Sequence, residues 1–320
     1  MRGSDGATLR LYRYLSRSVS LTSLNCMFVE ALERVDQFTR AIHFISRYYG
    51  SAEIIPQTAT MFFVNENGWA VTCKHVAENL INGDKVYAKY LAFKKEFRFF
   101  QKEPTAAVQK RRLEEKYSLN GETLIRVKNS FPESVTGDYQ LVIHRHPVYD
   151  LAIVRFVGYS GVKYRGFATF LKDEQKVRPG RSLCRLGYPF PEFTNYRLNT
   201  DIDDIEWSQE GKVGTPGFPI DGIITRQVAD QGGIFGIEMS TPGLRGQSGG
   251  PLFDKEGIVY GMQSATQHLH LGFDQVNREV ISDGVRKRVS NYPFLNVGRC
   301  VHVRIIKEFL REKGVKFYEG

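Results

Sequence analysis

Residues 246–253 read Gly-Gln-Ser-Gly-Gly-Pro-Leu-Phe, and this stretch decides between two fold classes. A serine between glycines also occurs in the nucleophile elbow of α/β-hydrolases, where a helix must follow the serine at once. Gly249, Gly250 and Pro251 would break such a helix, and a strand-like Leu-Phe pair follows them. The stretch therefore favours a β protein in which a sharp turn presents Ser248. The bland alternative is a Gly-rich hairpin whose serine has no role.

Short runs rich in β-branched and aromatic residues, separated by Gly, Pro, Asn and Asp, lie on both sides of this stretch. In the first half the expected strands cover 57–64, 69–73, 85–90, 123–128, 139–144 and 151–156. In the second half they cover 182–186, 211–213, 222–228, 233–239, 257–264 and 299–303. Strands of this length without intervening helices predict an all-β fold of two six-stranded antiparallel β-barrels.

Helical spacing is expected at both ends of the chain. Apolar residues recur with helical period over 28–49, and Gly50 is placed to end that helix. A second apolar face comes near the C-terminus, with Gly314 after it; its members are Ile305, Ile306, Phe309 and Leu310. We expect three segments: 1–55 as a basic tail and amphipathic helix, 56–158 as the first barrel with a basic insertion at about 85–122, and 159–320 as the second barrel and C-terminal helix.

Composition excludes several classes of protein. A chain of 320 residues with 42% hydrophobic and 25% charged residues is typical of a globular protein. No apolar run approaches the length of about eighteen residues that spans a bilayer, and the first residues lack the apolar core of a secretory signal. We therefore expect a protein without a membrane span.

The cysteines are scattered and form no C-x-x-C pair; they are Cys26, Cys73, Cys184 and Cys300. This pattern indicates neither a zinc site nor a dense disulfide framework. We expect free thiols, a cytoplasmic location, and neither metal nor cofactor. Two bridges, in any of three connectivities, remain an alternative.

Most of the formal charge of +9 lies in one segment. Residues 85–116 hold ten Lys or Arg and four Glu, a difference of 10 − 4 = +6. Aromatic residues interleave with these charges, so base stacking and phosphate binding would be feasible. A solvated charged helix over a buried aromatic face is the favoured interpretation, and a nucleic-acid partner is not expected, although the composition does not exclude one.

A serine hydroxyl becomes a useful nucleophile when a histidine accepts its proton and a carboxylate orients that histidine. Of seven histidines, only His75 stands at the end of a compact strand with a short helical stretch, 76–80, after it. Asp150 comes directly before an apolar run, where it could point into a cleft or simply start a strand. The remaining strand-region histidines read as surface residues; they are His144, His146, His268 and His270.

Several blocks resemble the trypsin-like serine peptidases, and among them the bacterial branch that includes the HtrA proteases. Residues 60–76, TMFFVNENGWAVTCKHV, are similar to that branch's first hairpin and histidine block. Residues 150–154, DLAIV, resemble its aspartate strand, and 246–253 resemble its serine loop. The resemblance covers about 57–315 and keeps the family's His, Asp, Ser order.

The resemblance implies an endopeptidase that cleaves protein or peptide substrates through an acyl-enzyme. It makes Ser248 the nucleophile, His75 the general base and then acid, and Asp150 the orienting carboxylate. It also gives the oxyanion hole to the amides of Gly246 and Ser248. A protease-fold scaffold or binding protein without hydrolysis is the alternative.

The resemblance also places a primary specificity pocket beside the nucleophile. Its floor falls on Pro242, its mouth near Arg245, and its wall on Gly261, Met262, Gln263 and Ser264. Because neither stretch offers a carboxylate, we expect cleavage after small or medium apolar residues such as Val, Ala or Leu rather than after Lys or Arg.

The chain departs from the family in three ways. Gln247 stands where secreted digestive members carry an aspartate that pairs with a new amino terminus, so activation by cleavage is not expected. No PDZ-like module is expected after Val303. The separation of His75 and Asp150 is long for this branch because of the basic insertion, which we expect to recruit a substrate or a regulatory protein partner.

Overall fold

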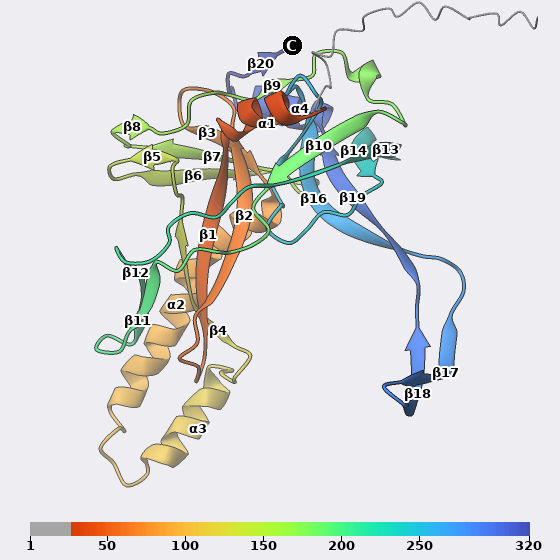
Figure 1. The fold of residues 1–320 in the computed structure, drawn as a ribbon. Coiled ribbons are helices and arrows are strands. Elements are labelled where there is room, and N and C mark those ends of the chain that lie inside the picture. The colour runs from red at the N-terminus through yellow and green to blue at the C-terminus, as the bar shows by residue number, and fades with distance from the viewer. Residues whose placement is uncertain (1–26) are drawn as a thin grey trace, which may run out of the picture.

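The computed structural model describes residues 27–320 and contains two antiparallel β units with helices at their margins (Figure 1). The expected basic tail and Cys26 lie outside the described residues. In the first unit six strands pair in the order β4-β1-β2-β3-β7-β6. Their bounds are β1 Thr39–Tyr48, β2 Ile55–Phe63, β3 Trp69–Thr72, β4 Leu124–Ser130, β6 Gln140–Arg145 and β7 Ala152–Val157.

The second unit is a closed ring of six antiparallel strands. Strand β15 pairs with β10 on one side and β16 on the other, so the order β15-β10-β13-β14-β19-β16 returns to its start. The bounds are β10 Ser182–Gly187, β13 Phe218–Asp230, β14 Gly233–Met239, β15 Pro251–Phe253, β16 Val259–His270 and β19 Phe294–His302. Closure removes the unpaired strand edges that an open sheet exposes. The predicted all-β, two-barrel fold class is confirmed.

Smaller strands decorate these units. Strands β9 (Thr169–Phe170) and β20 (Tyr318–Glu319) pair in parallel beyond β16. Three two-stranded ribbons complete the sheets: β5 (Val135–Thr136) with β8 (Gly161–Val162), β11 (Tyr196–Asn199) with β12 (Asp204–Trp207), and β17 (Gln275–Ser282) with β18 (Val285–Asn291).

In the described part of the chain, four α-helices accompany the strands: α1 Val29–Asp36, α2 Lys74–Arg98, α3 Ala106–Lys116 and α4 Val303–Glu312. A short 3₁₀ turn covers Glu174–Lys176. The predicted C-terminal helix is confirmed as α4, with Gly314 beyond its end at φ +64°. Within residues 27–320, no helix combines the length and apolar character needed to cross a membrane.

The predicted helix over 28–49 is wrong beyond Asp36, because 39–48 form strand β1. Strand β1 pairs with β2 on one side and β4 on the other, and its side chains are buried on both faces from Ala41 to Ser46. A strand buried on both faces lacks the apolar–polar alternation that identifies strands, so its apolar residues matched a helical period by chance. Gly50, at φ +75°, turns the chain between β1 and β2.

Two predicted strands are also wrong. Residues 85–90 lie inside α2, and 211–213 lie in a loop. Each unit still has six strands. Strand β1 replaces the predicted strand 85–90 in the first unit, and β15 replaces the predicted strand 211–213 in the second. The helix over 85–90 is stabilised by tertiary packing that overrides strand propensity.

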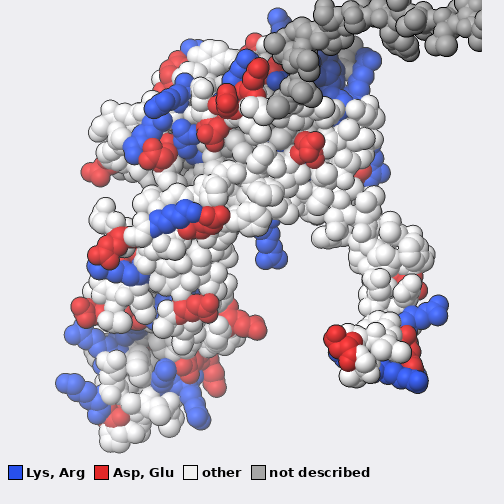
Figure 2. All heavy atoms as spheres, viewed as in Figure 1, with Lys and Arg blue, Asp and Glu red and all other residues white. Residues whose placement is uncertain are grey.

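Helices α2 and α3 form an arm that projects from the first unit (Figure 1). Its own small core contains Tyr90, Phe93, Leu113, Leu119 and Ile125, with further aromatic residues packed against it. The expected charged helix over a buried aromatic face is confirmed. On the face shown in Figure 2, acidic residues lie among the basic ones over this arm, so that face carries no continuous positive patch.

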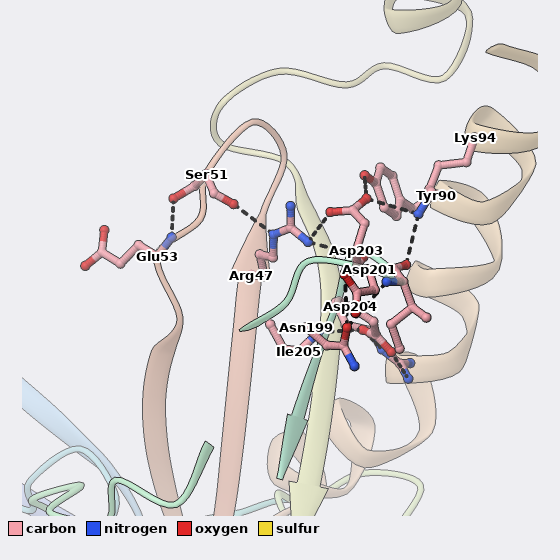
Figure 3. A network of polar contacts seen from close by, with 12 residues as sticks. Arg47, Ser51, Glu53, Tyr90, Lys94, Asn199, Asp201, Asp203, Asp204 and Ile205 are labelled. Atoms are coloured by element: carbon pink, nitrogen blue, oxygen red, sulfur yellow. Dashed lines mark hydrogen bonds and ion pairs between the residues drawn. The ribbon is translucent and has the colours of Figure 1, made fainter. Parts of the chain in front are cut away.

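An ion-pair network fastens the arm to the body (Figure 3). Asp203, in the turn between β11 and β12, accepts from Arg47 of β1 at 2.6 Å. Its other oxygen accepts from Tyr90 at 2.7 Å and Lys94 at 3.0 Å, both on α2. One carboxylate therefore joins the first sheet, the arm and the β11–β12 ribbon.

Candidate active site

His75 and Asp150 are brought together by the pairing of β3 with β7. Thr72, near the end of β3, lies opposite Ala152 at the start of β7. Helix α2 begins directly after β3 and places His75 in its first turn. The Nδ1 atom of His75 lies 2.9 Å from Oδ2 of Asp150, and the backbone N–H of His75 donates to Oδ1 at 3.1 Å.

The pKa of the Asp150 carboxyl lies below its ordinary value. Burial alone would raise this pKa, but the hydrogen bonds from the ring and backbone amide of His75, with the attraction of its ring, outweigh burial. Asp150 is therefore ionised at neutral pH. An ionised carboxylate is the form that holds the proton on Nδ1 of His75 and leaves Nε2 free to accept one.

Ser248 comes from the second unit, on the loop between β14 and β15. The loop is anchored to strand β2: the backbone N–H of Thr60 donates to the carbonyl of Ser248 at 2.9 Å, and the Thr60 hydroxyl donates to the carbonyl of Gly246 at 2.7 Å. Gly246 has φ +92°, and a Cβ there would lie 2.4 Å from the carbonyl oxygen of Tyr188. Only glycine fits such a backbone position.

The loop leaves two backbone N–H groups free for a ligand. The amides of Gln247, Gly249 and Gly250 donate to other carbonyls. Over residues 27–320, the structure shows no acceptor for the amides of Gly246 and Ser248. Unpaired donors beside a nucleophile are what an oxyanion hole requires.

The side chain of Gln247 links this loop to neighbouring backbone by two hydrogen bonds. It is fully buried, its carboxamide oxygen accepts from the amide of Leu244 at 3.0 Å, and its Nε2 donates to the carbonyl of Phe218 at 3.0 Å. The Gln247 side chain therefore makes its hydrogen bonds within the second unit.

His75 and Ser248 line one cleft of about 420 Å³ between the two units, together with Gly246 and Arg245. The Ser248 hydroxyl points to the carbonyl of Ser264 at 3.4 Å. In the described part of the chain no hydrogen bond joins it to Nε2 of His75. Such contacts are often long without substrate and tighten when substrate binds.

The residues predicted for the specificity pocket lie on two segments beside Ser248. The first segment covers 241–245 and the second covers 261–264. Arg245 is exposed at the mouth of the cleft, whereas Met262 and Gln263 are buried. Thr266, two residues beyond Ser264 on β16, donates its hydroxyl proton to the carbonyl of Gly243 at 2.6 Å and ties the segments together. The other predicted pocket residues are Pro242, on the first segment, and Gly261 and Ser264, on the second.

Sequence reasoning missed one residue behind these segments. Arg185, on β10, is completely buried, and its guanidinium donates to the carbonyl of Pro242 at 3.2 Å and to Oε1 of Gln263 at 2.7 Å. A signal was present, because Arg185 is the only charge in the apolar strand Ser182–Gly187.

Among residues 27–320, one group of side chains has donor types that suit a metal ion. Ligand atoms of Cys73, His75 and Asp150 lie within 4.8 Å of one another. Burial raises the pKa of the Cys73 thiol well above its ordinary value, which disfavours the thiolate that a metal requires. The Cys73 thiol instead donates to the carbonyl of Gln263 at 3.2 Å.

Residues 59–262 match the family model described as a trypsin-like peptidase domain, which covers more than half of the chain. Two similar solved structures are the HtrA-type protease AlgW with a tripeptide and a serine-to-alanine variant of it. Each shows 14% sequence identity and a TM-score of 0.43, with 88% of this chain covered. The chain spans 61% of the length of those proteins. No curated protein matches the chain.

Proposed function

The chain belongs to the trypsin-like peptidases, and we propose that it is a serine endopeptidase whose catalytic triad is Ser248, His75 and Asp150. The observation that carries the proposal is the shared cleft: His75, bonded to Asp150, lines it from one unit, and Ser248 lines it from the other. Its substrates are proteins or peptides, as the family implies.

In the proposed mechanism, Nε2 of His75 takes the hydroxyl proton as Ser248 Oγ attacks the substrate carbonyl carbon. The resulting oxyanion accepts from the amides of Gly246 and Ser248. His75 then gives its proton to the amine nitrogen as the carbon–nitrogen bond breaks, which leaves an acyl-enzyme. Water activated by His75 attacks this ester, and the acid product leaves as Ser248 regains its proton.

Labelling by a fluorophosphonate tests the proposal. The intact protein should be labelled at Ser248, and the variants Ser248→Ala and His75→Ala should lose both labelling and peptide hydrolysis. Ser282→Ala is the matched control, because Ser282 is exposed on strand β17, on a ribbon that projects away from the body (Figure 1). An intact protein that resists labelling and cleaves no peptide would instead favour the scaffold alternative.

The proposal includes activity without amino-terminal processing. It is supported by the internal hydrogen bonds of Gln247, since a side chain bonded to Leu244 and Phe218 needs no new amino terminus as partner. The full chain should therefore cleave peptides as purified. A protein that is inert until cut near residue 55 would show the reverse.

We also propose that the α2–α3 arm recruits a protein substrate or regulator. Most of its aromatic residues pack in its core, and Phe99 is largely exposed, so little stacking surface is left for a single-stranded nucleic acid, whereas exposed Arg111 and Arg112 remain on α3. Reversing both charges to Glu should slow cleavage of protein substrates and spare short peptides. An equal loss on both would assign the two arginines a structural role.

The expected preference for apolar residues at the cleavage site depends on the absence of a carboxylate from the two pocket segments. That absence supports the part of the expectation that excludes Lys and Arg. We keep this exclusion in the proposal. The choice among the other side chains depends on Arg185, which lies outside both segments.

A further inference from the structure

Arg185 is a buried cation whose hydrogen bonds all go to neutral oxygens. Its side chain is 0% exposed. One terminal nitrogen donates to the carbonyl of Thr241 at 3.0 Å, the hydroxyl of Thr241 at 2.6 Å and the carbonyl of Pro242 at 3.2 Å. The other terminal nitrogen donates to Oε1 of Gln263 at 2.7 Å.

No carboxylate within residues 27–320 forms an ion pair with Arg185, and its Nε has no hydrogen-bond acceptor. Burial lowers the pKa of this guanidinium, because removal from water disfavours its charge. Buried charges are ordinarily paired, since an unpaired one keeps its desolvation cost. Arg185 is therefore a cationic position that lacks its anion.

This position lies behind the two segments that flank the nucleophile. The first segment supplies the carbonyls of Thr241 and Pro242, which precede Ser248 by seven and six residues. The second supplies Gln263, next to the Ser264 carbonyl that Ser248 contacts at 3.4 Å.

Strand β19 brings the backbone against the same guanidinium. A Cβ on Gly298 would lie 2.3 Å from a terminal nitrogen of Arg185, and Gly298 pairs with Thr266 across the strands. Glycine at 298 thus leaves the space that the guanidinium fills, and a Cβ there would also lie 2.7 Å from the carbonyl oxygen of Thr241.

The Gln263 side chain now fills the region in front of Arg185. A Cβ on Gly243 would come within 2.2 Å of its Nε2, which also donates to the carbonyl of Ala265 at 2.7 Å. Its carboxamide has the shape of a glutamate carboxylate, and its oxygen already accepts from Arg185. The chain therefore presents an uncharged group where an acid would bind.

We propose that the pocket beside Ser248 accepts an acidic side chain, glutamate or aspartate, whose carboxylate displaces the Gln263 carboxamide and accepts from Arg185. We call this side chain, which belongs to the residue whose carbonyl Ser248 attacks, the primary side chain. The inference rests on the proposed function, and it assigns Arg185 as the residue that determines specificity.

The chemistry favours an acid over the other side chains. Arg185 already gives Gln263 a charge-assisted hydrogen bond, and an ionised carboxylate in its place would add the attraction between opposite charges in a buried region. A basic primary side chain would place two like charges together in a buried region. An apolar one would displace the Gln263 oxygen and leave Arg185 with one acceptor fewer.

Four peptides that differ only in a Glu, Gln, Val or Lys primary side chain test this directly. At pH 7.5 kcat/KM should be at least tenfold higher for Glu than for Gln, which has the same shape without charge, and lowest for Lys. A Val peptide cleaved faster than the Glu peptide, or equal rates for Glu and Gln, would overturn the inference.

Three variants locate the source of the preference. Arg185→Met should lose the tenfold preference for Glu over Gln, whereas Arg245→Gln, which removes the exposed arginine at the cleft mouth, should keep it. Gln263→Glu places an internal carboxylate on Arg185 and should abolish the preference while pairing the buried charge. If Arg185→Met fails to fold, Gln263→Glu decides, and an unchanged preference in it would overturn the inference.

A binding measurement separates this inference from the proposed function. In the Ser248→Ala protein, calorimetry should show at least tenfold tighter binding of a product peptide that ends in Glu than of one that ends in Gln. Equal binding together with normal fluorophosphonate labelling of the intact protein would refute the inference alone. Tighter binding of the Glu peptide by a protein that resists labelling would refute the proposed function alone.

Discussion

Replacement of Asp150 by asparagine is a sharp test of the proposed triad, because the structure shows which atom must change its role. Oδ1 of Asp150 accepts from the backbone N–H of His75 and also lies 3.1 Å from Nδ1, whereas Oδ2 contacts only Nδ1 at 2.9 Å. The backbone N–H can only donate. In Asp150→Asn the carboxamide oxygen must therefore face it, and the NH₂ group takes the place of Oδ2.

That NH₂ group would point a donor at Nδ1 of His75. Nδ1 must then lose its proton, which moves to Nε2, and His75 can no longer accept the proton of Ser248. We expect kcat to fall by about 10⁴-fold, which corresponds to about 5 kcal/mol of transition-state stabilisation. The fold should persist, since the replacement has the same size.

The assay is kcat/KM for a peptide substrate at pH 7.5, with circular dichroism to confirm the fold. The matched control is Asp230→Asn, whose carboxylate accepts from the Tyr149 hydroxyl at 3.1 Å and makes no contact with His75. If Asp150→Asn kept more than about a tenth of the wild-type kcat/KM, the assigned role of Asp150 would be refuted.

Three further outcomes are expected. Gly246→Ala should reduce kcat by about 10²–10³-fold because its methyl group would meet the Tyr188 carbonyl; an unchanged kcat would remove Gly246 from the oxyanion hole. Burial lowers the pKa of His43 and His302 to about 4, so the unfolded chain binds more protons than the folded one below pH 6.5. The free energy of unfolding from urea titrations should thus fall between pH 6.5 and 4, by at most about 3 kcal/mol for each histidine, and a flat profile would contradict this. In native protein, mass spectrometry should find slow alkylation, and rapid alkylation only after denaturation, of three buried thiols: Cys73, Cys184 and Cys300.

Local signals predicted most of the strands, and the errors share a physical cause. A half-buried strand shows alternation, but β1 is buried on both faces. Ile42 and Phe44 belong to the main core, whereas Ile45 packs in a second core with Phe193 and Ile205, which lie far along the chain. Period alone could not reveal those contacts.

The segment 85–90 is the reverse error, because a strand was predicted and a helix forms. Its valine and tyrosines favour a strand locally, yet the Tyr90 ring stacks near Phe93 one turn later, and both join a core with Leu113 and Ile125. That core exists only after α3 and β4 have folded against α2. Tertiary packing therefore decided the outcome.

The proposed catalytic blocks could be predicted from sequence because each is a short local pattern. The proposed base of the specificity pocket could not, since it combines Arg185 of β10, Gln263 of β16 and Gly298 of β19. A charge inside an apolar strand was the one available clue. Its partners become apparent only when the second barrel closes.

Helix α2 runs without a break from His75 in its first turn to the far end of the arm, over Lys74–Arg98. Twenty-five residues of α-helix measure about 37 Å. The proposed general base and the arm therefore belong to one helix, which Asp203 contacts through Tyr90 and Lys94. Under the proposed mechanism, a partner that displaced the outer end of this helix would also reorient the imidazole of His75 relative to Ser248 and so change the rate of catalysis.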